Sequence, residues 1–342
     1  MRVTIRTVAA EAGVSITTAS RALSGEGRMQ AETRARVRAV AERLDYRPNS
    51  MARGLVQQRS FTVGLLTNDT YGRFTMPVAA GMSAATVDRG VSIFLASGQN
   101  DPELTRLNLK AFEDKRVDGL IVSGKRIDRT LPIELSRIGI PTIHVMSACP
   151  PGGVGFAPDD FGGALQAARH LAGLGRRRIA HLTGPQGFQA ARIREAGWRQ
   201  ALDEAGLAPP APASFGTWSE EEGFAAARRL FVPDAPGPAP DAVFCGNDQI
   251  ARGLIDGLTR MGIAVPDDVA VVGFDNWEIF AIATRPPLST VDMGLLDLGR
   301  QAGLTLLDMI DGREVAPGLQ HAPARLIVRR SCGGGGTGGG DD

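Results

Sequence analysis

The sequence predicts an N-terminal all-α helix-turn-helix head followed by an α/β body of two doubly wound parallel-sheet subdomains. The predicted helix-turn-helix domain, residues 1–46, carries three short helical stretches interrupted by a glycine. The chain beyond residue 60 alternates short apolar runs with amphipathic helical stretches. Charge divides the chain at the same place. Residues 1–59 contain eleven arginines and five acids, a net charge of +6, whereas the other 283 residues carry 27 bases and 32 acids, a net charge of −5.

The first helix is predicted from an apolar face formed by Val8, Ala9 and Ala12, with Thr4 in the position of an N-cap. Gly13 then interrupts the pattern where a tight turn needs a positive φ. Helix, tight turn and second helix together make the helix-turn-helix pattern.

The second helix begins after Ser15, whose side-chain oxygen can cap it. Its buried stripe leaves one polar face exposed. The expected buried residues are Ala19, Ala22 and Leu23, and the expected exposed residues are Ile16, Thr17, Ser20 and Arg21.

The exposed face of the second helix suits a DNA major groove. Arg21 can bond guanine O6 and N7, Thr17 can bond a base edge, and Ile16 can contact a thymine methyl group. Ser15 and Thr18 more naturally bond phosphate. An ordinary helical hairpin is the alternative, but a basic head on an acidic body is typical of a phosphate-binding module.

A third helix closes the head, with an apolar stripe at Val37, Val40, Ala41 and Leu44. Residues 47–58 are predicted to form a hinge helix. Pro48 stops the third helix, and Asn49 can cap a short helix that is marginal alone because it is brief and contains Gly54. Leu55 could insert between base steps and kink the duplex; the alternative is a simple linker.

The body, residues 59–331, is predicted to hold parallel sheets with crossover helices. Its length exceeds the usual length of a single α/β domain, so two subdomains with a cleft between them are expected. The predicted strands are 62–67, 91–97, 118–123, 141–145, 178–183, 241–245 and 269–274.

Ligands of such sheets bind beyond the carboxyl ends of the strands. Asn247 and Asp275 directly follow predicted strands, Arg194 lies in a helix after another, and Trp218 precedes an acidic helix start. An aromatic ring, a guanidinium, a carboxylate and an amide suit a sugar, whose C–H face stacks on indole and whose hydroxyls meet polar groups. Phe74 could stack on a second face of the ligand. Helix capping for Asn247 and Asp275, core packing for Trp218 and an exposed loop position for Phe74 are the alternatives.

Further positions near this cleft would determine the ligand specificity. They are Ser123-Gly124-Lys125, Met146 and Asp292-Met293.

The sequence resembles the LacI/GalR family of bacterial repressors over nearly its whole length. The most specific motifs are AGVSITTASRAL, TRARV and LDYRPNSMARGL. The resemblance implies backbone contacts from Thr4, Ser15, Thr18 and Asn49, base contacts from Ile16, Thr17 and Arg21, and a minor-groove insertion by Leu55. Arg6-Thr7 and Ser24-Gly25 depart from the family pattern, which puts local phosphate contacts in doubt but not the fold.

For the body, the resemblance implies a periplasmic-binding-protein-like fold with chain crossings near Phe156, Pro287 and Gln320. The first subdomain would contain 60–157 plus 288–320, and the second 158–287 plus 321–331. Arg194, Trp218, Asn247 and Asp275 match effector-contact positions of sugar-responsive members. Met146 stands where some sugar-binding relatives have a carboxylate, so their preference does not transfer.

The expected function is a repressor that a sugar or sugar derivative releases from a pseudo-palindromic operator in double-stranded DNA. Two alternatives remain: a repressor that needs a purine corepressor or a partner protein, and a transport receptor, which would need an export signal where this chain has its basic head. Two half-sites require a homodimer, with residues 279–282 or the helix 249–261 as candidate interfaces. A tetramer is not expected, because the Gly-rich tail 332–342 lacks a leucine heptad and should be disordered.

Other classes are disfavoured. The chain has four histidines and none of the motifs HExxH, GxSxG or GxxxxGK[ST], so it is not expected to be an enzyme and no cofactor is expected. Asp159-Asp160 is better explained as a helix cap than as a metal or catalytic pair. Three scattered cysteines predict neither a zinc site nor a disulfide framework. With no export signal and no membrane-spanning apolar run, a cytoplasmic location without membrane attachment is expected.

Overall fold

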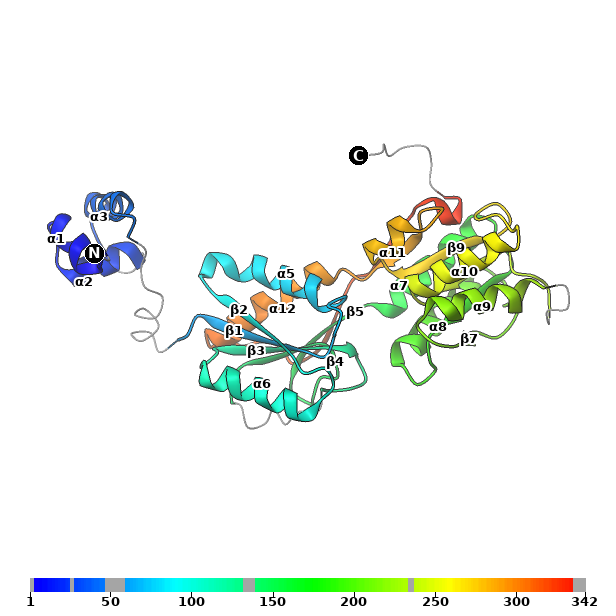
Figure 1. Cartoon of the computed structure of the whole chain (residues 1–342), viewed down its shortest axis with the longest axis horizontal. Coiled ribbons are helices and arrows are strands. Elements are labelled where there is room, and N and C mark those ends of the chain that lie inside the picture. Colours follow the sequence, from blue (N-terminus) through cyan, green and yellow to red (C-terminus); the bar gives the residue numbers. More distant parts are fainter. Residues whose placement is uncertain (1–2, 25–27, 47–58, 132–138, 233–236, 335–342) are drawn as a thin grey trace. The chain divides into compact units, whose positions relative to one another are not determined.

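The structure is a computed structural model, described for residues 3–24, 28–46, 59–131, 139–232 and 237–334. The chain divides into two compact units, Met1–Phe61 and Thr62–Asp342, called here the head and the body (Figure 1). The predicted hinge, with Asn49 and Leu55, and most of the Gly-rich tail lie outside the described residues.

The described residues of the head form the helices α1 (Ile5–Glu11), α2 (Ile16–Ser24) and α3 (Ala31–Arg43). Thr4 is the N-cap residue of α1, and Gly13 has a φ of +64° in the turn, both as predicted. Ser15 Oγ accepts a hydrogen bond of 3.1 Å from the Thr18 backbone N–H and so caps α2. The predicted stripes meet in one core, against which Leu23 and Leu44 pack partly buried. Its buried members are Val8, Ala9, Ala12, Ala19, Ala22, Val37, Val40 and Ala41.

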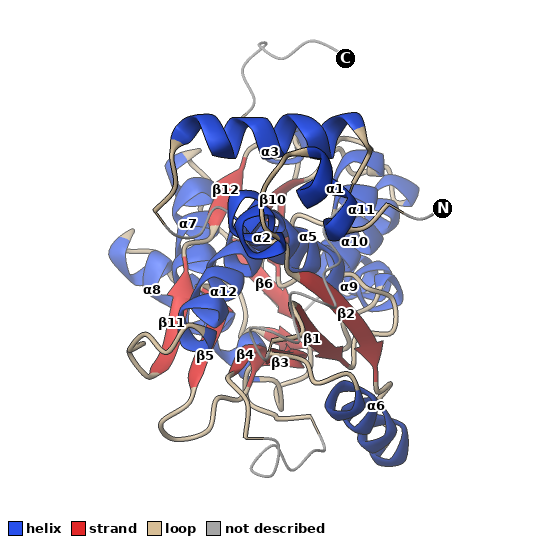
Figure 2. Cartoon of the chain, turned by 90° about the vertical axis from the view of Figure 1, so that its left-hand side faces the viewer, coloured by secondary structure: helices blue, strands red, loops and turns tan. Residues whose placement is uncertain are grey.

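The described strands of the body form two six-stranded sheets, and Figure 2 shows helices beside these strands. The first sheet has the order β11 (Gly318–Ala322), β5 (Val154–Pro158), β4 (Thr142–Ser147), β3 (Gly119–Arg126), β1 (Thr62–Thr67) and β2 (Ser92–Ser97). The second has the order β12 (Arg325–Ile327), β10 (Ser289–Asp292), β9 (Ala270–Asp275), β8 (Ala242–Cys245), β6 (Ile179–Thr183) and β7 (Ser214–Phe215). Every pairing is parallel except that of β10 with β12.

The helices of the body pack largely in pairs, with α5 against α12, α7 against α8 and α9 against α10. Glycines allow close approach: a Cβ atom at Gly299 in α12 would lie 2.2 Å from the Val78 carbonyl oxygen of α5. The helices are α5 (Thr75–Thr86), α6 (Pro102–Asp114), α7 (Asp160–Gly173), α8 (Gln189–Glu204), α9 (Glu220–Phe231), α10 (Asp248–Arg260), α11 (Glu278–Ala283) and α12 (Leu295–Ile310), with 3-10 turns η1 (Val87–Arg89) and η3 (Arg330–Cys332).

The seven predicted strands all occur, as β1, β2, β3, β4, β6, β8 and β9, with ends shifted by three residues or fewer. The second chain crossing differs from the expectation. Residues 289–292 form β10, which pairs with β9 of the second sheet, so the chain crosses at residues 292–295 rather than near Pro287. A four-residue strand carries too little apolar pattern to be seen in the sequence.

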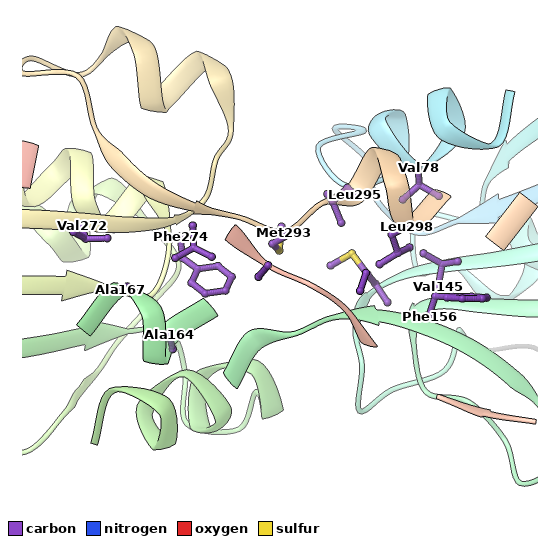
Figure 3. Packing of buried hydrophobic residues seen from close by; sticks show 14 of the residues in the cluster. Val78, Val145, Phe156, Ala164, Ala167, Val272, Phe274, Met293, Leu295 and Leu298 are labelled. Carbon is purple, nitrogen blue, oxygen red and sulfur yellow. The ribbon is translucent and has the colours of Figure 1, made fainter. Parts of the chain in front are cut away.

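One buried apolar cluster runs through both subdomains at this crossing. Met293 is 1 % exposed, and Figure 3 shows it between Phe274 of the second sheet and Leu295 at the start of α12. The chain segment that joins the subdomains is therefore packed in the core at this point.

The two candidate interface segments differ in exposure. The apolar face of α10 is buried inside the body, with Ile250 and Leu254 fully covered, so it is unavailable to a second copy. In α11, Phe280 and Ala281 are buried, while Ile279 and Ile282 are 66 % and 50 % exposed.

Candidate functional site

The head presents one face of α2 to solvent. Ile16 is 46 % exposed, and Thr17 and Arg21 are also exposed. Ser15 and Thr18 are joined through their hydroxyls at 2.8 Å, so both belong to the cap of this helix. The predicted base-contacting side chains thus all lie on the exposed side of α2.

The body encloses a cavity of about 610 Å³ lined by both subdomains. All five side chains proposed from the sequence line it: Phe74, Arg194, Trp218, Asn247 and Asp275. Among the further predicted positions, Gly124, Lys125 and Met146 also line it, whereas Met293 is buried in the core. The other lining residues are Asn68, Arg73, Asn100, Arg126, Ile127, Arg129, Thr130, Pro158, Asp160, Phe188 and Ala190.

Asn247 caps a helix and faces the cavity at the same time. Its Oδ1 accepts a hydrogen bond of 2.8 Å from the Ile250 backbone N–H at the start of α10, which confirms the capping role. A side-chain amide has a separate pair of N–H donors, which the cap does not need. Capping and ligand contact are therefore compatible for this residue.

Asp275 ends β9 in an unusual backbone conformation, with a φ of +108°. Non-glycine residues in such regions cost about 1–3 kcal/mol and occur most often at functional sites. The strand end turns the carboxylate toward two arginines of the cavity wall, Arg73 and Arg194.

Arg194 is 6 % exposed and is held by several groups of the second subdomain. Its Nε and Nη2 lie 2.8 and 2.6 Å from Asp160 Oδ1, and its Nη1 donates to the Gly246 carbonyl oxygen at 2.5 Å and lies 3.5 Å from Asp275 Oδ1. The guanidinium carbon lies 3.7 Å from the centroid of the Phe274 ring. Burial, charge pairing and ring contact together fix the guanidinium in one orientation.

Asp159 and Asp160 have different roles, although the sequence favoured capping for the pair. Asp159 Oδ1 accepts from the Gly162 N–H at 2.8 Å and is the cap of α7. Asp160 is 4 % exposed, lines the cavity and pairs with Arg194. The cap needs only one carboxylate, which leaves the second available for the arginine.

Arg73 crosses from the first subdomain to the second. It forms an ion pair with Asp275, and its Nη1 donates to Gln249 Oε1 at 2.9 Å. Its guanidinium carbon lies 4.8 Å from the Phe74 ring centroid and 4.9 Å from that of Trp277. Burial lowers the pKa of Arg73 to about 10, which leaves the group charged at neutral pH.

A second contact crosses between the subdomains at Arg126, at the end of β3. Arg126 Nη2 donates to the Gly187 carbonyl oxygen at 2.7 Å, and its guanidinium carbon lies 3.8 Å from the Phe188 ring centroid. Phe188 meets Trp218 edge-on at 5.9 Å. A Cβ atom at Gly184 would lie 2.0 Å from the Trp218 indole, so glycine is needed there to leave room for the ring.

Next to the lining residue Asn247 is Asp248, a fully buried acid at the first position of α10. It accepts hydrogen bonds from the Trp277 backbone N–H at 2.7 Å and from Thr290 Oγ1 at 2.5 Å. Burial raises the pKa of Asp248 from 3.8 to about 7.

This acid should make the stability of the body depend on pH. Between pH 4 and 7 the folded protein holds a proton on Asp248 that the unfolded chain has released. The contribution of this proton to the free energy of unfolding is therefore fully present below pH 4 and is lost as the pH rises through 7. The loss should approach ~4 kcal/mol. Asp248→Asn should flatten the dependence of the urea-unfolding free energy on pH in this range; an unchanged slope would show that other groups cause it.

In the described part of the chain, no three histidine, cysteine or acidic side chains are grouped so that they could hold a metal ion. Among the described helices, none combines the length and apolar character needed to cross a membrane.

An exposed helix-turn-helix surface on a basic head, with a polar and aromatic cavity in a two-subdomain body, defines a ligand-responsive DNA-binding regulator. Comparisons with known proteins agree. Residues 4–49 match the family described as bacterial regulatory proteins, lacI family, and residues 168–332 match a periplasmic binding protein-like domain.

Relatives match over nearly the full length of this chain. The transcriptional repressor PurR of Haemophilus influenzae is 30 % identical, and the regulator CelR of Thermobifida fusca is 33 % identical; each match covers 96 % of this chain and 98 % of the relative. The structure of the Lac repressor dimer bound to operator and the anti-inducer ONPF is 28 % identical, covers 97 % of this chain and 99 % of that one, and has a TM-score of 0.74. The chain belongs to the lacI family of bacterial regulatory proteins.

Proposed function

We propose that this protein is a cytoplasmic repressor, not an enzyme, that a sugar or sugar derivative releases from a pseudo-palindromic operator. The observation that carries the ligand part of this proposal is the shared cavity, because five side chains from different helices, strands and turns converge on it. A cavity of about 610 Å³ is within the ordinary range of small-molecule sites, about 300–1,000 Å³.

For operator recognition we assign base contacts to Ile16, Thr17 and Arg21, which occupy the exposed surface of α2. Thr4, Ser15 and Thr18 are assigned to the phosphate backbone, as is Asn49 in the hinge. Leu55 is assigned to insertion in the minor groove.

Arg21→Ala should weaken binding to the best operator by about 1–3 kcal/mol and relax the base preference at one position of each half-site, because the bidentate contact to guanine is lost. Arg38→Ala is the matched control: it removes the same charge from an exposed position on α3, outside the proposed base-contacting surface. Fluorescence anisotropy against all four bases at each operator position measures both effects. If the two variants show the same base preferences, Arg21 does not contact a base.

The effector is proposed to be a sugar because the cavity combines an indole with a carboxylate, a guanidinium and an amide. The structure titled CelR-cellobiose complex belongs to a relative that is 31 % identical over 96 % of this chain, which supports this class. The second candidate is a purine corepressor, favoured by the similarity to PurR and by the aromatic rings of Phe74 and Trp218 on the cavity wall.

The coupling we propose is two-state. Ligand closes the cavity, the subdomains shift across a homodimer, and the hinges that hold the heads on DNA separate. The direct contacts of Arg73 and Arg126 between the subdomains are elements that closure would strengthen or rearrange. Coupling is reciprocal, so operator DNA must weaken binding of a releasing ligand by the same factor, commonly about 5- to 150-fold.

The DNA-binding part is tested by selecting sequences from random duplexes with the full-length protein. Enrichment of a two-fold symmetric motif is expected, since two heads contact two half-sites. The ligand part is tested by adding sugars and purines to the selected operator complex. A protein that enriches no motif is not a sequence-specific regulator, and release or tightening by purines alone would transfer the effector assignment to that class.

A further inference from the structure

The cavity carries an excess of positive charge. Among the residues that the structure describes, five cationic side chains line it: Arg73, Lys125, Arg126, Arg129 and Arg194. Two carboxylates from the same described residues line it, Asp160 and Asp275. A neutral sugar needs no such excess of positive charge. Whether the excess indicates an anionic ligand therefore depends on which of these cations already pair with carboxylates of the protein.

Three of the five cations are already compensated within the protein. Arg194 pairs with Asp160 and lies beside Asp275, and Arg73 pairs with Asp275. Arg126 pairs with Asp128 at 2.8 Å, a carboxylate outside the lining. Both lining carboxylates are therefore occupied by arginines.

Lys125 and Arg129 are the remaining cations. Within the described part of the chain, neither side chain forms an ion pair or hydrogen bond. Both are exposed, and both come from the short segment around the end of β3, so their charges lie on the wall of the first subdomain.

The same wall offers an unused acceptor. Asn68 Nδ2 donates to Asn100 Oδ1 at 2.8 Å, while Asn68 Oδ1 is buried and has no hydrogen-bond partner. Asn68 lines the cavity, so a ligand hydroxyl could donate to this oxygen. The wall therefore combines an acceptor for a hydroxyl with two cations for an anion.

We propose that the effector is an anionic sugar derivative, a polyhydroxylated molecule with one carboxylate or phosphate group that Lys125 and Arg129 bind. The hydroxyls lie between Asn68 and the opposite wall of Asp275, Asn247 and Trp218. This inference rests on the proposed function and narrows its ligand class. Charge-assisted hydrogen bonds at the anionic group should raise affinity about 10- to 100-fold over the neutral parent sugar.

The test uses the full-length protein and matched ligands: glucose, gluconate, glucuronate and glucose 6-phosphate, with inorganic phosphate as the anion alone. Thermal shift and calorimetric titration are measured for the wild type, for Lys125→Gln/Arg129→Gln, and for Lys110→Gln/Lys115→Gln. The last variant loses the same charge from exposed positions of the first subdomain outside the cavity.

The expected result is that at least one acid or phosphate binds about 10- to 100-fold more tightly than glucose, weakens as salt is added, and loses this advantage only in the cavity variant. Whether a sugar acid or the sugar phosphate binds more tightly identifies the anionic group of the effector as a carboxylate or a phosphate. The inference is overturned if glucose binds as tightly as the anions, or if the cavity variant keeps the higher affinity for the anions. It is also overturned if only inorganic phosphate binds, or if no ligand of the panel binds. A neutral sugar that still releases the operator would leave the proposed function standing, whereas failure to enrich an operator would remove that function instead.

Discussion

Trp218→Ala is expected to abolish the response of operator binding to ligand while ligand-free operator binding is retained. The indole lines the cavity and lies against Phe188 and Gly184. Truncation of such an aromatic anchor commonly costs about 2–4 kcal/mol of binding, or about 30- to 1,000-fold in affinity. The head is a separate compact unit, so its own packing does not include this side chain, and ligand-free operator binding should persist.

The measurement is operator release as a function of ligand concentration, together with calorimetric titration of ligand into free protein. Phe224→Ala is the matched control, because it truncates a partly buried aromatic residue on α9 that does not line the cavity. An unchanged ligand response in Trp218→Ala would remove that residue from the site. A similar loss in both variants would point to destabilisation of the subdomain instead.

The head was predictable from sequence because its signals are local. The turn glycine, Gly13, and the cap, Ser15, specify α1, turn and α2 within a few residues, and the apolar stripes have a clear helical period. The main strands were equally clear, because strands buried on both faces appear as apolar runs.

The second crossing could not be placed in this way. Residues 289–292 read STVD, in which only Val291 is strongly apolar, and the strand exists because β9 offers it a parallel edge. Its formation is a tertiary effect that a local pattern does not record.

The cavity residues also divide into those with a local signal in the sequence and those that depend on tertiary contacts. The residues that follow strands were found because the carboxyl ends of parallel strands gather at one edge. Arg73 and Arg126 were missed, since what singles them out is a partner on the other subdomain: Gln249 for one and Gly187 for the other. A signal for Asp160 was available, because a helix start uses one capping carboxylate and this sequence has two.

Asp160→Asn is expected to destabilise the body by about 3–5 kcal/mol, because it leaves the buried Arg194 guanidinium without its main carboxylate. Breaking a buried pair costs more than the pair contributes, because the largely buried guanidinium loses its nearest carboxylate without regaining full hydration. Asp275 cannot take over this role, because it already pairs with Arg73 and lies 3.5 Å from Arg194.

The protein offers a matched control between the same two helices. Arg169 of α7 and Glu204 of α8 form a bidentate pair with distances of 2.6 and 2.9 Å, but both side chains are solvent-exposed. Glu204→Gln should therefore change stability far less than Asp160→Asn, because water screens and replaces the exposed interaction. Urea unfolding followed by tryptophan fluorescence reports on the body alone, since Trp198, Trp218 and Trp277 all lie there. Equal effects of the two variants would mean that burial does not set the strength of the Asp160 pair, and that Arg194 keeps its orientation without this carboxylate.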